Sequence, residues 1–299
     1  MKQKTLKRAY GFEGKGLHTG TFSHVCIKPA PEDSGIRFVR TDLGVEIPAL
    51  AGNVTNTARC TLIAKGDASV STIEHLMSAF TGMGVDNALV EIDNVEVPIL
   101  DGSARFYAAA IAADGLAEQA AERRYLGLSE TVEVRHEPTG SWVKVEPADH
   151  FSCECTSDFG SRVLGVQSAF WDESTDYLTQ IAPCRTFVFF HEVQYLASKG
   201  LVKGGDVDNA IVVVEHPVPE EVISDMAEQI GRPSIRVTPQ GYLNNISLNF
   251  PDECGRHKLL DLIGDIRLAG GYPLAKVTAY KPGHTINNAA ARAVQKVLK

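Results

Sequence analysis

The stretch RHKLLDLIGD, residues 256–265, places three chemically active side chains inside an apolar helical pattern. His257, Asp261 and Asp265 follow one another at intervals of four, so an α-helix stacks them along one face. The leucines and the isoleucine between them indicate that this helix packs against a core. A solvated face at the same spacing would more often contain lysine and glutamate. The stretch therefore predicts a functional helix whose partners come from elsewhere in the chain.

Two successive series of short strands and helices surround this helix. Alternating runs bounded by glycine and proline indicate antiparallel strands, and longer apolar runs indicate helices. In the first half we expect strands at 24–31, 35–42, 46–50 and 85–92, and helices at 71–84 and 104–116. In the second half we expect strands at 131–137, 141–147, 151–158 and 207–214, and helices at 189–201 and 257–271. Ser71 is the expected N-cap of the helix at 71–84, and Gly84 its expected end.

The two series predict an α+β fold made of two similar domains. The runs VDNALV at 85–90 and VDNAIV at 207–212 are nearly identical, which favours a duplicated unit. The polar stretch 117–130 is the expected boundary. We therefore expect a first domain at 1–124 and a second at 125–299.

The composition limits the classes of partner. The chain has 299 residues, is 44% hydrophobic and carries a net charge of -8 with a pI of about 5.6. This acidic balance argues against a surface for nucleic acid or anionic membranes, which requires clustered lysine and arginine. Local basic groups remain compatible with a bound phosphate.

The same sequence predicts a cytoplasmic protein. Residues 1–16 contain positive charges with no apolar segment after them, so we expect no signal peptide. No run approaches the roughly 20 apolar residues that span a bilayer. We expect the six cysteines to be free thiols, as in a reducing compartment. The pair at 153 and 155 lacks the second pair of a zinc knuckle.

A zinc site is one interpretation of the histidines and carboxylates. His257 and Asp261 can present two ligands to one ion from the same helix face, and His75 can supply a third. An ordinary surface pair at this spacing is the alternative. Glu74 likewise has two interpretations. The sequence STIE, residues 71–74, is also a capping box in which Glu74 bonds back to the helix start rather than taking part in catalysis.

Seven motifs, taken together and in order, resemble the UDP-3-O-acyl-N-acetylglucosamine deacetylase family, zinc amidases of bacterial lipid A synthesis. The motifs extend over almost the whole chain: GKGLHTG (14–20), RTDLGVEIPA (40–49), STIEHLMSAFTGMGVDNALVEI (71–92), VPILDGSA (97–104), CRTFVFFHEVQYLASKGLVKGGDVDNAIVV (184–213), RHKLLDLIGD (256–265) and YKPGHTINN (280–288). Two departures stand out: Pro282 replaces the serine of many members, and 217–254 fits the family pattern poorly.

The resemblance implies an architecture. Members have two α+β domains of similar topology, each a sheet layer with helices packed against it, and the active site lies between them. Each domain also carries a small insert, which we place near 50–70 and near 190–215. The first insert helps to shape the site, and the second forms an apolar passage for the acyl chain.

The resemblance also implies roles for twelve residues of this chain. The match assigns one zinc ion to His75, His257 and Asp261. It assigns the general base to Glu74 and the general acid to His284, with Asp265 as the carboxylate beside that histidine. Thr186 matches the hydroxyl that helps to hold the oxyanion. The expected substrate contacts are Lys258, Lys281, Leu17, His18 and Phe187.

The implied reaction is hydrolysis of the N-acetyl group of UDP-3-O-acyl-N-acetylglucosamine to acetate and the free amine. This is the committed step of lipid A synthesis. The expected protein is a monomer that binds this small acylated UDP-amino sugar and no nucleic acid, and it is compatible with peripheral contact with the inner membrane. Fe²⁺ is the alternative metal. A zinc amidase for a different N-acyl sugar and a non-enzymatic binding protein with the same fold are the alternative functions. Some relatives carry a fused C-terminal dehydratase, which we do not expect within these residues.

Overall fold

The first sheet is formed by five strands from the N-terminal half. The computed structural model describes residues 1–193, 209–229 and 234–298. The sheet has the order β2-β3-β9-β4-β5, with β2 at Tyr10–Lys15, β3 at Phe22–Pro29, β9 at Ala88–Ile92, β4 at Ile36–Arg40 and β5 at Val45–Pro48. Alternate residues of β4 and β9 are buried, as the alternating sequence predicts for a sheet with one face against the core.

The second sheet repeats this plan. Its main path has the order β12-β13-β18-β14-β15, with β12 at Val132–His136, β13 at Ser141–Pro147, β18 at Tyr272–Tyr280, β14 at Ser152–Asp158 and β15 at Val166–Asp172. In both sheets the last strand of the unit is inserted between the second and the third, antiparallel to one and parallel to the other. The predicted α+β class with two similar units is therefore confirmed.

The short sequence repeat is not the signature of this duplication. The run at 85–90 leads into β9, the central strand of the first sheet. The equivalent strand of the second sheet is β18, which the sequence patterns did not predict. The described part of the run at 207–212 leads instead into β17, Ile211–Val213, which pairs with β16, Phe187–Phe189, in a two-stranded parallel sheet apart from both main sheets. The two VDNA runs are therefore not equivalent positions of the two units, and using them as a sign of duplication was wrong. The two similar units that they were taken to indicate are nevertheless present.

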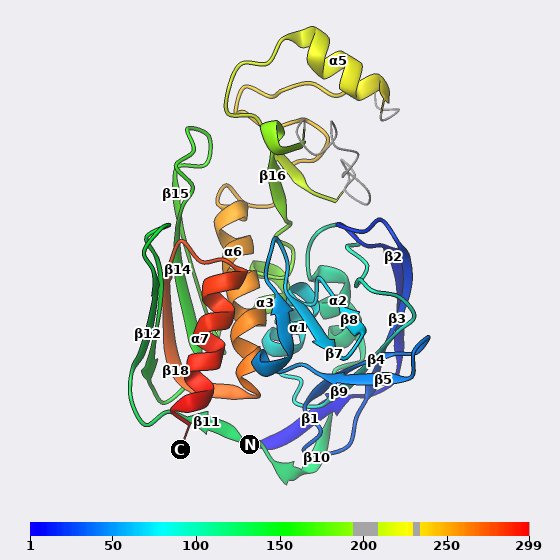
Figure 1. The fold of residues 1–299 in the computed structure, drawn as a ribbon, viewed down its shortest axis with the longest axis vertical. Helices are drawn as coiled ribbons and strands as arrows, with labels where there is room; N and C mark the ends of the chain where they lie inside the picture. Colours follow the sequence, from blue (N-terminus) through cyan, green and yellow to red (C-terminus); the bar gives the residue numbers. More distant parts are fainter. Residues whose placement is uncertain (194–208, 230–233, 299) are drawn as a thin grey trace.

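The main helices of both halves lie between the two sheets (Figure 1). They are α1 at Glu74–Gly82, α2 at Arg105–Asp114, α6 at Glu253–Ile266 and α7 at His284–Lys296. In the second unit, α6 packs on β14 and β15 while α7 packs on β12 and β13. Buried apolar side chains from both sheets and all four helices form one continuous core cluster. Helix α1 packs directly on α6, so the halves meet at the helices that carry the candidate ligands.

Both units are interrupted at the same point, between the fourth strand and the first helix. The first interruption contains η1 at Ala51–Asn53, β6 at Val54–Asn56, β7 at Leu62–Lys65 and β8 at Ala68–Val70, in agreement with the insert expected near 50–70. The second contains α3 at Tyr177–Gln180, β16, β17 and α5 at Glu220–Gln229. Its outer part projects from the two-sheet body around an apolar cluster of its own (Figure 1). Of the insert expected at 190–215, residues 194–208 lie outside the described residues.

The chain passes between the halves through two short strands. Strand β10, Leu116–Glu122, pairs with β1, Lys2–Leu6, at the N-terminus. Strand β11, Tyr125–Gly127, pairs with β18 of the second sheet. This crossover lies inside the predicted boundary stretch 117–130, and the domain limits at 124 and 125 remain a proposal.

Several local predictions have clear outcomes. Helix α1 ends at Gly82, and Gly84 follows it with a φ of 80°, the conformation that glycine adopts after a helix. Of the helix predicted at 189–201, residues 190–193 are helical in the structure. Residues 194–201 lie outside the described residues. The helix at 257–271 starts earlier, at Glu253, and continues into η2 at Arg267–Ala269. All six cysteines are free, as predicted.

One further finding concerns membrane spans. Among the helices within the described ranges, none combines the length and the apolar character that a bilayer crossing requires.

The close contact of α1 with α6 requires a glycine. A Cβ on Gly264 would collide with the carbonyl oxygen of Glu74 and lie 3.0 Å from the backbone nitrogen of Ser78. We predict that Gly264→Ala lowers the free energy of unfolding by about 1–3 kcal/mol, because both atoms belong to rigid helix backbone. Urea unfolding followed by circular dichroism measures this loss.

Gly52→Ala is the matched control, since a Cβ added at this position in η1 would have nothing within 4 Å of it. Equal unfolding midpoints for Gly264→Ala and the wild type would contradict the proposed role of this contact.

Candidate active site

Three buried side chains from the two halves converge where α1 meets α6. The Nε2 atoms of His75 and His257 lie 3.7 and 3.5 Å from Oδ1 of Asp261. One potential ligand atom from each residue lies within 4.8 Å of the others, and no other such group of His, Cys, Asp or Glu occurs in the part of the chain that the structure describes. His75 occupies the first turn of α1, while His257 and Asp261 are one turn apart on α6. Helix packing therefore makes one site from residues that are far apart in sequence.

Neighbouring groups orient these three side chains. Nδ1 of His257 lies 3.1 Å from the carbonyl oxygen of Cys184, so that nitrogen carries the proton and Nε2 faces Asp261 with a free lone pair. Lys258 Nζ donates to Oδ2 of Asp261 at 2.9 Å. The other oxygen of Asp261, Oδ1, is buried and has no hydrogen-bond partner.

The protonation states fit a divalent cation. Burial lowers the pKa of His75 to about 3 and also lowers the pKa of His257, so both imidazoles are neutral near pH 7. Burial opposes ionisation of Asp261, but the neighbouring His257 ring and the ammonium group of Lys258 hold its pKa well below the usual range. Two neutral imidazoles and an unpartnered carboxylate oxygen form a donor set that suits zinc. An uncompensated buried carboxylate oxygen is otherwise costly.

Glu74 lies beside this cluster and is not part of a capping box. The residue before the helix is Ile73, which makes no side-chain cap, and Ser71 instead donates its hydroxyl to the carbonyl of Val95. Oε2 of Glu74 accepts the backbone N–H of Thr61 at 3.0 Å. The capping-box prediction was therefore wrong, because the chain enters the helix through Thr72, which has a φ of 59°, and Ser71 is held in a bridge with Glu96. Burial raises the pKa of Glu74 to about 7.

His284 faces Glu74 from the start of α7. Its Nε2 lies 3.9 Å from Oε1 of Glu74, and its Nδ1 lies 3.0 Å from Oδ2 of Asp265. Asn287 Nδ2 donates to the same oxygen of Asp265 at 3.1 Å. Burial by itself lowers the pKa of His284, but the charges of Asp265 and Glu74 and the bond to Asp265 raise it to about 9. His284 is therefore an imidazolium at neutral pH, with Nε2 directed at Glu74.

The sequence did not single out Thr61, although it contacts more groups of this site than most predicted residues do. Its hydroxyl donates to Oδ1 of Asp265 at 2.5 Å and accepts from Nδ2 of Asn288 at 3.1 Å. Thr61 is fully buried at the end of the β6–β7 connection. A single threonine in a loop has no distinctive sequence pattern, so only the fold reveals it.

The segment 184–187 runs along α6 and brings the predicted residue Phe187 beside His257. The Phe187 ring centroid lies 6.4 Å from that of His257, and Lys258 Nζ lies 5.4 Å above the same phenyl ring. Thr186 precedes Phe187, and its backbone N–H donates to the carbonyl of Gly102. Arg185 anchors the segment through a buried ion pair with Glu253 in the first turn of α6.

The other predicted substrate residues, His18, Leu17 and Lys281, have different contacts in the structure. His18 has a buried, unpartnered Nε2, and burial together with the positive charges of Arg59 and His284 lowers its pKa against the opposing effect of Glu96. Glu96 also accepts the backbone N–H of His18 and so holds the loop that contains Leu17. Lys281 instead pairs with Asp158 at 3.2 Å. The structure thus shows no contact between Lys281 and the metal cluster.

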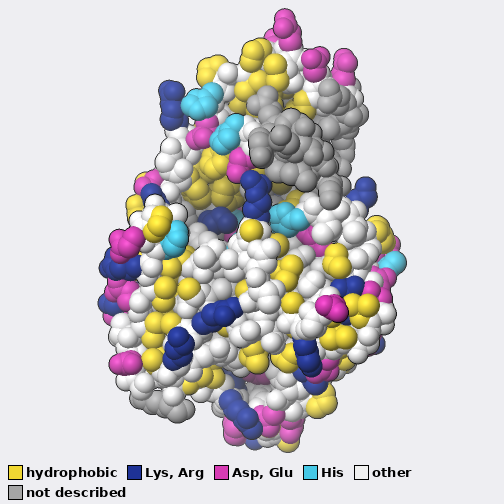
Figure 2. Space-filling view, viewed as in Figure 1, with side chains coloured by type: hydrophobic (Ala, Val, Ile, Leu, Met, Phe, Trp, Pro, Cys, Tyr) yellow, Lys and Arg dark blue, Asp and Glu magenta, His cyan; other side chains and the backbone are white. Residues whose placement is uncertain are grey.

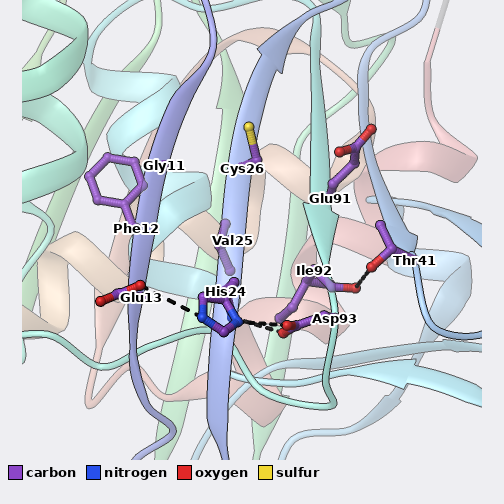
Figure 3. A pocket seen from close by; sticks show the side chains of 10 residues that line it. All are labelled: Gly11, Phe12, Glu13, His24, Val25, Cys26, Thr41, Glu91, Ile92 and Asp93. Carbon is purple, nitrogen blue, oxygen red and sulfur yellow. Dashed lines mark hydrogen bonds and ion pairs between the residues drawn. The ribbon is translucent and has the colours of Figure 1, made fainter.

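Two further regions of the molecule gather histidine and charged side chains. Hydrophobic, basic and histidine side chains gather where the projecting insert meets the two-sheet body (Figure 2). A separate hollow lies on the outer face of the first sheet, where exposed His24 stands between Asp93 at 2.7 Å and Glu13 at 3.7 Å (Figure 3). These three exposed residues form surface ion pairs. His24 therefore offers a control position for substitutions in the buried cluster.

The family model and the similar proteins that match this chain all point to one family. Residues 3–228 and 232–296 match the model of the LpxC family, described as UDP-3-O-acyl N-acetylglycosamine deacetylase. The chain is 43% identical over its whole length to the bifunctional enzyme LpxC/FabZ of Porphyromonas gingivalis and spans 65% of that protein. It is 40% identical over 98% of its length to the UDP-3-O-acyl-N-acetylglucosamine deacetylase of Myxococcus xanthus, of which it covers 86%. The deacetylase of Anaeromyxobacter is 39% identical, with 98% and 88% covered.

We predict that His257→Ala and His75→Ala each abolish tight zinc binding, because each removes one of three protein ligands. Metal analysis after dialysis should find about one zinc ion per chain in the wild type and less than about a tenth of that in either variant. Added zinc should also raise the melting temperature of the wild type, but not that of His257→Ala or His75→Ala.

His24→Ala is the matched control, and it should keep the zinc content of the wild type. Undiminished zinc in His257→Ala would contradict the assignment of the site to this cluster.

Proposed function

Because the chain belongs to the LpxC family of deacetylases, we propose that it hydrolyses the N-acetyl group of UDP-3-O-acyl-N-acetylglucosamine. The products are acetate and UDP-3-O-acyl-glucosamine, at the committed step of lipid A synthesis. One observation supports this most strongly: a three-residue metal cluster lies beside Glu74 and the His284–Asp265 pair. Metal-dependent amide hydrolysis uses that combination of a cation site, a proton acceptor and a proton donor.

His75, His257 and Asp261 would hold one zinc ion. Bound there, zinc would activate water and polarise the acetyl carbonyl. Oδ1 of Asp261 and the two Nε2 atoms are the groups available for it. Lys258 keeps Asp261 ionised, and the carbonyl of Cys184 fixes the tautomer of His257.

Glu74 and His284 would move the protons. Oε1 of Glu74 takes a proton from water as the water oxygen bonds to the acetyl carbon. Nε2 of His284 gives its proton to the sugar nitrogen as the carbon–nitrogen bond breaks, so the amine leaves neutral. Asp265 favours the imidazolium that this step needs. Glu74 then passes its proton to His284, which restores both groups, and the acetic acid formed loses its proton to solvent.

Other predicted residues would bind the substrate. Thr186 would donate its hydroxyl to the carbonyl oxygen as negative charge develops there. Lys258 and Lys281 would face the sugar and diphosphate, with His18 and Leu17 lining the site.

The acyl chain would follow the apolar side chains of the second insert. Phe187 joins the metal cluster to a group of buried and half-buried apolar residues, which comprises Leu164, Ile211, Val213 and Cys254 with Phe159, Val163, Phe189, Tyr242, Ile246 and Leu248 around them. This continuity favours the acylated substrate over the alternative, a different N-acyl sugar without a long chain. We further propose a monomer in the cytoplasm that contacts the inner membrane only peripherally, and Zn²⁺ rather than Fe²⁺ as its metal.

We predict that the purified chain releases acetate from UDP-3-O-acyl-N-acetylglucosamine, and that a chelator stops release until zinc is restored. UDP-N-acetylglucosamine should react at least about 100-fold more slowly, since binding of the acyl chain contributes to catalysis. Coupled acetate detection measures both rates.

Glu74→Gln supplies the control, because it should retain zinc while kcat falls by about 10²–10⁴. Equal rates with the two nucleotide sugars would favour the alternative amidase. Absence of both zinc and acetate release would favour a non-enzymatic binding protein.

A bell-shaped dependence of kcat/KM on pH should follow from the two pKa values. Glu74 acts as the ionised base, so activity should rise with pH through about 7. His284 acts as the protonated acid, so activity should fall as the pH passes about 9. In Asp265→Asn the negative charge that raises the pKa of His284 is lost, so the alkaline limb should move to lower pH. An alkaline limb that stays in place would contradict the role of Asp265.

A further inference from the structure

Thr61 bonds to both halves of the proposed proton-transfer machinery. Its backbone N–H donates to Oε2 of Glu74 at 3.0 Å, and its hydroxyl donates to Oδ1 of Asp265 at 2.5 Å. Glu74 begins α1 and Asp265 lies near the end of α6, so the contacts join the two halves of the molecule. Thr61 itself comes from the first insert, outside both helices.

Each of the two contacts occupies one carboxylate oxygen and leaves the other oxygen of that carboxylate facing His284. With Oε2 of Glu74 held by Thr61, Oε1 is the oxygen directed at Nε2 of His284. With Oδ1 of Asp265 held by the hydroxyl, Oδ2 accepts from Nδ1 of His284. Each carboxylate is thereby fixed in one rotation about its terminal bond.

The hydroxyl also contributes to the orientation of His284. Nδ1 of His284 lies 3.4 Å from the Thr61 oxygen and 3.0 Å from Asp265, so its proton points between the two. Asn288 Nδ2 donates both to the Thr61 oxygen at 3.1 Å and to the carbonyl of His284 at 2.8 Å. The hydroxyl is therefore an acceptor from Asn288 and a donor to Asp265 at once, and its hydrogen has one direction available.

We propose that Thr61 is a positioning residue that fixes Glu74 and His284 relative to each other during amide hydrolysis. It acts through Asp265 and through its own backbone and does not touch the reacting atoms. The inference rests on the proposed function, because it assumes that these two residues exchange protons with the substrate. Catalytic groups lose much of their effect when misplaced by even about 1 Å, so the loss of such a contact affects turnover before binding.

The test compares two substitutions that separate the hydroxyl from the volume of the side chain. Thr61→Val keeps the shape and removes the hydroxyl, whereas Thr61→Ser keeps the hydroxyl and removes a methyl group. We expect kcat to fall by about 10–100-fold in Thr61→Val, with KM and zinc content unchanged, and to recover to within about threefold of the wild type in Thr61→Ser.

Two controls show whether the effect passes through Asp265. Thr55→Val, at an exposed position of the same insert, should leave kcat unchanged. Adding Thr61→Val to Asp265→Asn should cost little beyond Asp265→Asn alone, because the bonded partner has already changed. Wild-type kcat in Thr61→Val, an equal loss in Thr61→Ser, or fully additive losses in the double variant would each overturn the inference.

A separate measurement distinguishes failure of this inference from failure of the proposed function. If the wild type releases no acetate, the proposed function fails, and the Thr61 arrangement is judged by proton NMR. The Nδ1 proton of His284 should give a low-field resonance in the wild type and in Thr61→Ser that shifts or disappears in Thr61→Val. An unchanged resonance in Thr61→Val would show that the hydroxyl does not hold this histidine.

Discussion

The active site depends on the close packing of α1 against α6. Gly264 leaves room for the carbonyl of Glu74, and this approach brings the first turn of one helix against the middle of the other. His75 thereby reaches His257 and Asp261. An α-helix can place two ligands on one face by its own geometry, but the third must come from a second rigid element. The duplicated unit supplies that element, since α1 and α6 occupy equivalent positions in the two halves.

Burial determines the electrostatic character of the site. The same loss of solvation lowers the pKa values of His75 and His257 and raises that of Glu74. His284 differs because Asp265 and Glu74 face it, so their negative charges exceed the effect of burial. Similar surroundings thus yield neutral histidines at the candidate metal cluster and a charged imidazole at His284. The outcome depends on which charges lie within a few ångströms.

The two inserts add different side chains to the site of an otherwise repeated scaffold. Each interrupts its unit immediately before the helix that carries metal ligands, so its ends lie at the site. The first insert contributes Thr61, which bonds Glu74 and Asp265. The second contributes Phe187 beside His257, and the carbonyl of Cys184 next to it. The repeated core carries the candidate cation site, while the inserts differ from each other and place different side chains beside it.

The sequence by itself determined the α+β class, most elements, and the identity of the ligand candidates. Hydrophobic periodicity is local, and His257, Asp261 and Asp265 share a helix face whatever the rest of the chain does. It did not determine the central strand β18, whose pairing is non-local, or the true basis of the duplication, since the VDNA run at 207–212 leads into an insert strand. Only the tertiary structure decided that Glu74 is not part of a capping box, that His75 lies beside Asp261 on α6, and that Thr61 belongs to the site. Those facts depend on contacts between residues 13 to 204 positions apart, and no local pattern of residue types records such contacts.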